Sequence, residues 1–157
     1  MESVVPNTIT HTESQVRALY DQLIHCWNER EHTAFAELFL HDGYTIGFDG
    51  TVSNGKSQIN QHLSEVFQHH QTALYISIVR SIRALNDSVW IVHADVGMIP
   101  PGSKEINPKL NAVQSLVVMK TVHGFRIALL QNTLASFHGR PEVVEQLTNE
   151  LNKTYGQ

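Results

Sequence analysis

The sequence predicts an α+β fold in which N-terminal helices pack on a strongly curved, mainly antiparallel sheet that encloses a pocket. Apolar residues recur at helical spacing over roughly the first seventy positions, and after that the period changes to two. Helices followed by a run of strands are typical of the α+β class. The 157 residues, of which 41% are hydrophobic, are enough for one domain with one core.

Two helices are expected first. Thr12 and Gln15 have the spacing of a capping box and predict the start of the first helix. Its apolar stripe contains Val16, Leu19, Tyr20, Leu23, Ile24 and Trp27. A second, shorter helix has a predicted buried face made of Ala34, Phe35, Leu38 and Phe39.

A short hairpin and a third helix come next. Residues 44–48 predict a strand, and Asp49-Gly50 is a strong hairpin signal. Asn54 is predicted to cap the third helix, because asparagine is a favoured N-cap residue. Its buried face is expected to consist of Ile59, Leu63, Val66 and Phe67.

Four long strands and a last helix complete the prediction. The strands are expected at residues 74–85, 89–99, 111–122 and 125–136. The dipeptides Asn86-Asp87 and His123-Gly124 predict tight turns, so the first two strands and the last two are expected to form antiparallel hairpins. Pro141 suits the first position of the last helix. We expect a flexible tail at 1–11, a domain at 12–136 and a C-terminal helix extension at 137–157.

Composition argues against several classes of partner. The net charge of −4 does not favour a nucleic acid or an anionic membrane. No stretch approaches the roughly 18 apolar residues of a membrane helix, and residues 1–11 do not read as a signal peptide. A single cysteine, Cys26, favours the reducing cytoplasm. We expect no cofactor and no metal, since neither a glycine-rich phosphate loop nor an HExxH motif occurs.

The strand at 89–99 is apolar on both faces. One face carries Val89 and Ile91 beside two polar residues, and the other carries Trp90, Val92, Ala94, Val96 and Met98. A sheet with one wet face alternates more cleanly. If helices cover one face, a second copy of the chain is the simplest cover for the other, so we expect a homodimer packed through the sheet.

His93 and Asp95 are the candidate catalytic residues. They lie two positions apart on the strand, so their side chains point to the same side. On one reading His93 is a base whose ring Asp95 orients, and both face a ligand. On the other, the two form a structural hydrogen bond, or Asp95 simply reaches water. The catalytic reading requires His93 to lie on the helix-covered face, next to a cavity.

Other polar residues are candidates for ligand binding. Gln114, Gln131 and Asn132 interrupt apolar strands and could hydrogen-bond a ligand carbonyl or hydroxyl, or could satisfy backbone groups instead. Arg80 could pair with Asp95, with an acidic ligand, or only with solvent. Trp27 is expected in the core, with an indole N–H that could reach the pocket.

Several strings, in order, resemble a known family. The first part of the chain, with Trp27-Asn28, Ala34 to Phe39, Asp49-Gly50 and Gly55-Lys56, resembles the SnoaL-like branch of the nuclear transport factor 2-like superfamily. Val92-His93-Ala94, Gln114 to Val117 and Gln131 to Thr133 resemble its SgcJ/EcaC subgroup. The resemblance covers residues 12–133. It implies a cone-shaped, cystatin-like fold with a pocket, usually a dimer, and a pocket Asp or His that moves a proton in catalytic members.

The sequence thus favours a dimer that binds a small apolar or amphipathic molecule. It could be a proton-transfer enzyme of the isomerase, cyclase or dehydratase type. The alternative is a dimerisation or ligand-binding module without catalysis. Fold alone does not choose between them.

Overall fold

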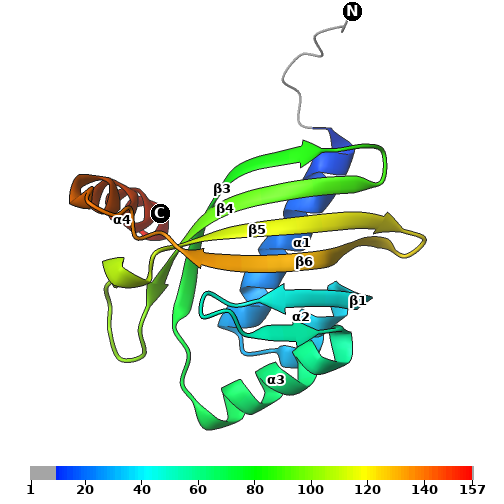
Figure 1. Ribbon diagram of the computed structural model, residues 1–157, viewed down its shortest axis with the longest axis horizontal. Coiled ribbons are helices and arrows are strands. Elements are labelled where there is room, and N and C mark those ends of the chain that lie inside the picture. Colours follow the sequence, from blue (N-terminus) through cyan, green and yellow to red (C-terminus); the bar gives the residue numbers. More distant parts are fainter. Residues whose placement is uncertain (1–9, 157) are drawn as a thin grey trace, which may run out of the picture.

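Six strands form a single sheet in the computed structural model, which describes residues 10–156. They are β1 (Phe39–Ile46), β2 (Val52–Asn54), β3 (Leu74–Ala84), β4 (Val89–Ile99), β5 (Ala112–Thr121) and β6 (Gly124–Leu134). Their order is β2-β1-β6-β5-β4-β3, and all neighbours are antiparallel except β1 and β6, which run parallel (Figure 1). The predicted α+β class and both predicted long hairpins are confirmed.

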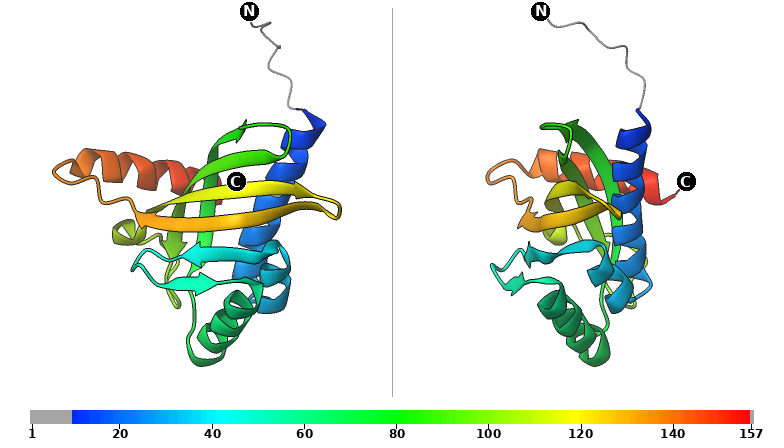
Figure 2. Two further views of the ribbon diagram at one scale, coloured as in Figure 1. Left: turned by 45° about the vertical axis from the view of Figure 1, so that its right-hand side comes forward. Right: turned by 90° about the vertical axis from the view of Figure 1, so that its right-hand side faces the viewer.

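Three helices precede the long strands. They are α1 (His11–Asn28), α2 (His32–Glu37) and α3 (Lys56–His69). The long α1 crosses behind β3 to β6, while α2 and α3 lie below it beside β1 and β2 (Figures 1 and 2). The fourth helix, α4 (Pro141–Tyr155), lies at the far end of the sheet.

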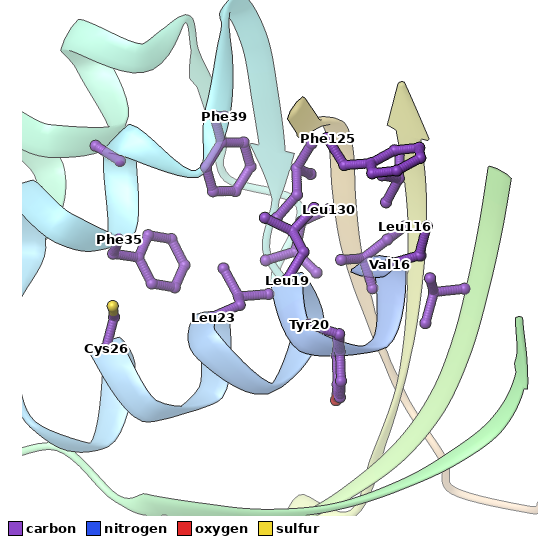
Figure 3. Close-up of a cluster of buried hydrophobic side chains, with 14 of the residues drawn as sticks. Val16, Leu19, Tyr20, Leu23, Cys26, Phe35, Phe39, Leu116, Phe125 and Leu130 are labelled. Carbon is purple, nitrogen blue, oxygen red and sulfur yellow. The ribbon is translucent and has the colours of Figure 1, made fainter. Parts of the chain in front are cut away.

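The main core fills the space between α1, α2, α3 and the sheet. Val16, Leu19 and Leu23 of α1 point toward Leu116 and Leu130 of the sheet (Figure 3). All five are at most 9% exposed. Burying a leucine side chain contributes about 1.5–3 kcal/mol, so the predicted stripe of α1 is what holds this helix on the sheet.

Two helix starts differ from the prediction. Thr10, not Thr12, caps α1, since its hydroxyl accepts a hydrogen bond from the backbone N of Glu13 at 3.0 Å. Asn54 does not cap α3, because it still belongs to β2 and pairs with Tyr44. The N-cap is Gly55, whose φ of 92° lies in the left-handed region that glycine adopts readily.

The strand β1 begins at Phe39, five residues earlier than predicted. Phe39 pairs with Ile127 of β6 instead of ending the second helix, and the register shifts between Phe39 and Tyr44. Gly43 lies in this irregular stretch, where an added Cβ would be 2.7 Å from the Ile127 carbonyl oxygen. A parallel partner distant in sequence determines this strand, and local periodicity cannot reveal it.

The helix α4 covers one end of the sheet on the face away from α1. Leu147 and Leu151 pack against Ile99, Ile106 and Ala135. The predicted tail at 1–11 lies mostly outside the described residues, and His11 already belongs to α1. None of the helices among residues 10–156 is long and apolar enough to cross a membrane.

Candidate functional site

A cavity of about 270 Å³ opens between α1, α3, the β1–β2 hairpin and the sheet. Its wall is mostly apolar and includes Leu23, Ile24, Phe35, Ile59, Leu63, Val66 and Leu130. An engineered apolar cavity of about 150 Å³ holds benzene, so this one has room for a molecule of about two rings. The cavity lies on the helix-covered face of the sheet, where the sequence predicted a pocket.

Two amide side chains line the cavity from the sheet, and we call this part of its wall the inner end. Gln114 of β5 and Asn132 of β6 face each other directly across the strand pair, so both side chains point to the same side. Gln114 is 1% exposed. Its Oε1 accepts a hydrogen bond of 2.5 Å from the Tyr20 hydroxyl. Burial raises the pKa of Tyr20, so this hydroxyl stays protonated and keeps Gln114 in one orientation.

Asn132 is less constrained. Its Oδ1 is buried and has no hydrogen-bond partner among the described residues. Trp90 Nε1 and Asn111 Oδ1 share that condition, but of the three residues only Asn132 lines the cavity. A buried acceptor without a partner costs about 1–3 kcal/mol, so this atom calls for an explanation.

Aromatic rings form one side of the cavity. Trp27 and Tyr75 both line it, and their rings stack with centroids 4.9 Å apart. The Trp27 indole N–H donates to the Ala73 carbonyl at 3.0 Å, so the ring and not the N–H is offered to the cavity. Burial raises the pKa of Tyr75 to about 12, which keeps its hydroxyl neutral.

The mouth of the cavity carries the groups that can exchange protons. Phe48, Asp49 and Thr51 of the β1–β2 hairpin and His62 of α3 line the cavity and are exposed to solvent. The backbone N–H of Thr51 donates to Asp49 Oδ1 at 2.9 Å, and this hydrogen bond lowers the pKa of Asp49. The carboxylate is therefore ionised at neutral pH, which places a negative charge at the entrance.

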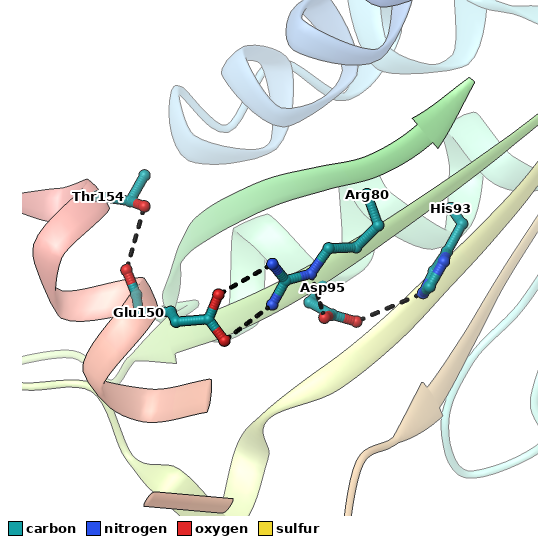
Figure 4. Close-up of polar contacts among 5 residues, drawn as sticks. All are labelled: Arg80, His93, Asp95, Glu150 and Thr154. Atoms are coloured by element: carbon teal, nitrogen blue, oxygen red, sulfur yellow. Dashed lines mark hydrogen bonds and ion pairs between the residues drawn. The ribbon is translucent and has the colours of Figure 1, made fainter. Parts of the chain in front are cut away.

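His93 and Asp95 do not reach the cavity, and the prediction that they face it is wrong. Residues of β4 alternate between the two faces, and it is Val92 and Ala94 that pack on the helices. His93 points to the opposite face, where Nε2 lies 3.5 Å from Asp95 Oδ1 (Figure 4). The alternative reading, a His–Asp contact near solvent, is the one the structure has.

Arg80 lies with them on that face. A β-bulge between Val79 and Ser81 turns its side chain toward Asp95, and Nε is 2.7 Å from Asp95 Oδ2. Its two terminal nitrogens donate to both carboxylate oxygens of Glu150 on α4, at 3.0 and 3.2 Å (Figure 4). Of the predicted partners of Arg80, Asp95 is therefore present, and Glu150 was not foreseen.

Of the other predicted ligand-binding residues, Trp27, Gln114 and Asn132 line the cavity and Gln131 does not. Gln131 is exposed on the outer face because it pairs with Ser115, one position out of phase with the Gln114–Asn132 pair. Periodicity alone did not say which of the two phases faces the helices.

The sequence reading missed Tyr20, Asp49, His62 and Tyr75. His62 follows Ile59 by three positions, so the helical period places it at the edge of the buried face, and this signal was available. Asp49 was read only as a turn residue. Within residues 10–156 no three His, Cys, Asp or Glu side chains come together in a group that could hold a metal ion.

No protein-family model matches the chain, and no curated protein matches it. Solved structures do. A domain of unknown function with a cystatin-like fold from Nostoc punctiforme PCC 73102 is 24% identical, with a TM-score of 0.78 over 96% of this chain and 100% of that one. The chain has the cystatin-like, nuclear transport factor 2-like fold.

Two further solved structures are less similar to this chain. A ketosteroid isomerase-like protein from Erwinia carotovora atroseptica SCRI1043 is 13% identical, with a TM-score of 0.64 over 81% of this chain and 98% of that one. A protein of unknown function from Shewanella oneidensis MR-1 is 14% identical, with a TM-score of 0.64 over 76% and 97%. At these identities the likeness shows the fold alone, and the SgcJ/EcaC subgroup stays a prediction.

Proposed function

We propose that this chain binds a small, mostly apolar molecule in the cavity and does so as a homodimer. The cavity's walls are aliphatic and aromatic, and a few polar groups sit at its inner end and its mouth. This combination is typical of small-molecule sites, in which apolar contacts supply affinity and a few polar groups fix orientation.

The observation that carries the proposal is the pair of amides at the inner end. Gln114 is almost fully buried and Asn132 Oδ1 has no partner among the described residues. Polar groups buried without partners are costly, and native structures rarely keep them without a reason. A ligand with a polar group at its inner end would supply the missing partner.

The dimer is supported by the outer face of the sheet. The helix α4 covers only one end of it, and half-buried apolar side chains remain beyond that helix: Val89, Ile91, Val117, Met119 and Leu129. A face of this kind is an ordinary surface for association. The dimerisation module without a ligand is the competing function, and it would leave the amide pair without a role.

Proton transfer is the second candidate function, and the position of Asp49 and His62 favours it. Both line the mouth, and the ionised Asp49 could accept a proton from a bound ligand. The ketosteroid isomerase-like neighbour shares only the fold. His93 and Asp95 would not take part, since both lie on the other face.

The test of binding is a thermal-shift screen with lipophilic ketones, enols and acids. A ligand at a hundred times its Kd adds about 2.7 kcal/mol of stability, which raises Tm by roughly 5–10 °C in a domain of this size. Val66→Trp would fill the cavity from α3 and abolish the shift, whereas Glu65→Trp, on an exposed neighbour, would keep it. Hits that survive Val66→Trp would place binding elsewhere.

No hit at all would favour the dimerisation module. For any hit that is a ketone, NMR in D2O measures exchange of the hydrogens next to the carbonyl. Exchange that Asp49→Asn removes, while binding persists, would establish proton transfer. Binding without exchange would leave a binding protein.

A further inference from the structure

The two amides at the inner end of the cavity are not equivalent. Gln114 Oε1 already accepts a hydrogen bond from the Tyr20 hydroxyl, so the N–H donors of Gln114 are the part of its amide that is left for a ligand to pair. No described residue accepts a hydrogen bond from Gln114 Nε2, and this nitrogen is not among the completely covered polar atoms without a partner. Gln114 lines the cavity, and Nε2 is the polar atom of its side chain that has no partner among the described residues.

Asn132 offers what Gln114 lacks. Its Oδ1 is an acceptor without a partner, and no hydrogen bond among the described residues holds its side chain. The terminal torsion of asparagine is broad, so a donor in the cavity can be met by a small rotation. Gln114 and Asn132 are directly opposed in the β5–β6 ladder, which puts their Cβ atoms about 4.5–5.5 Å apart. The inner end thus presents a donor beside an acceptor.

We infer that the cavity selects a neutral amide, such as a lactam fused to an apolar ring, whose carbonyl accepts from Gln114 Nε2 and whose N–H donates to Asn132 Oδ1. This inference rests on the proposed function. An amide satisfies both side chains at once, whereas a ketone or ester offers no donor and leaves Asn132 Oδ1 unpaired.

Charge argues against the acidic alternative. A carboxylic acid has a donor and an acceptor only when neutral, and it is ionised at neutral pH. Among residues 10–156, those that line the cavity include no lysine and no arginine, and His62 and the Asp49 carboxylate lie at its exposed mouth. An anion held by Gln114 and Asn132 would therefore be desolvated with no lysine or arginine to pair with it. A lactam has no charge to desolvate.

Two bicyclic compounds of nearly the same shape test the inference. In 2-quinolinone the ring holds an N–H beside the carbonyl, and in coumarin an oxygen replaces the N–H. By calorimetry we expect 2-quinolinone to bind about tenfold more tightly than coumarin, the scale of one buried hydrogen bond and its unpaired partner. Methylation of the lactam nitrogen removes the donor and should cost at least as much.

Asn132→Leu should reduce the 2-quinolinone preference to within about twofold by removing the acceptor. Gln131→Leu also replaces an amide with leucine, at the preceding residue, whose side chain lies on the outer face. This variant should preserve the preference for 2-quinolinone. If Asn132→Leu does not fold, the coumarin and N-methyl comparisons with the unaltered chain still decide. Equal affinities for 2-quinolinone, its N-methyl derivative and coumarin would overturn the inference and leave the binding function intact. If naphthalene, coumarin and 2-quinolinone all fail to bind, both the inference and the proposed function are wrong.

Discussion

The two faces of this sheet are built from alternate residues of the same strands, yet they treat polar groups in opposite ways. On the helix-covered face Gln114 is 1% exposed, and its side chain has a single hydrogen bond within residues 10–156, to Tyr20. On the outer face Arg80 has two carboxylate partners, and the side chains of Arg80 and Glu150 are 30% and 42% exposed. The first face is poor in polar contacts, and the second carries a partly exposed cluster of ion pairs beside α4.

The difference indicates which face has a site. Water can replace a lost partner on the outer face, so its ion pairs are worth about 0–1 kcal/mol each. On the inner face Gln114 is 1% exposed, so a partner lost there is hard to replace, and a buried amide is costly unless it serves a ligand or the fold. His93 and Asp95 are the more conspicuous pair in the sequence, but the less conspicuous Gln114 and Asn132 lie where binding can occur.

The largest effect is expected from a substitution on the outer face that disrupts the proposed dimer. Val117→Glu puts a charge in the middle of its half-buried apolar side chains, and burying an unpaired carboxylate in a dimer costs several kcal/mol. We expect the dimer to weaken by at least a hundredfold in sedimentation velocity experiments. Val122→Glu is the matched control, because Val122 is 96% exposed in the β5–β6 turn. An unaltered chain that sediments as a monomer at micromolar concentration would rule the dimer out.

An intermediate effect is expected on the inner face. Tyr20→Phe removes the donor to Gln114 Oε1 and leaves that oxygen buried without it, so we expect a loss of about 1–3 kcal/mol in the free energy of unfolding. Tyr75→Phe is the comparison, since no described residue hydrogen-bonds the Tyr75 hydroxyl, and its cost should stay within about 0.5 kcal/mol. Urea denaturation measures both. Equal losses would mean that the Tyr20–Gln114 bond has no special weight.

The period of the apolar residues was sufficient to predict the α+β class and the longest helix and strands. The stripe of α1 and the strand at 89–99 lie where the period placed them, because each repeats one signal over many residues. It failed at Phe39, which belongs to β1 because of a parallel partner, Ile127, that is far away in the sequence. It failed again at Asn54, which extends β2 and leaves the cap to Gly55.

Only half of the candidate site could be predicted, because the strand period does not show which of the two faces of the sheet the helices cover. A strand has two faces, and His93 and Gln114 were each assigned to the pocket without knowing which face the helices cover. In β4 the aliphatic Val92 and Ala94 face the helices, so His93 does not. A bulge at Arg80 changes the phase of β3 as well, and no sequence signal marked it. Asp49 required the cavity to be seen, whereas the helical spacing of His62 from Ile59 was a signal that was overlooked.

The smallest expected effect concerns the ion pair that ties α4 to the sheet. The hydrogen bonds from Arg80 lower the pKa of Glu150 below its ordinary value of 4.5. A lowered pKa means that the pair stabilises the fold at pH values above 4.5, and that this contribution is lost as the pH falls through the lower, folded-state pKa.

Because Glu150 is 42% exposed, solvent screens the pair and Glu150→Gln should cost at most about 1 kcal/mol at pH 7. The cost should shrink as the pH falls below 4.5 and through the lowered pKa of Glu150, because the unaltered chain then loses the same charge. Glu145→Gln, on an exposed position of α4, should cost nothing measurable at any pH. A Glu150→Gln cost that does not change with pH in urea titrations would show that the charge of Glu150 does not contribute to holding α4 on the sheet.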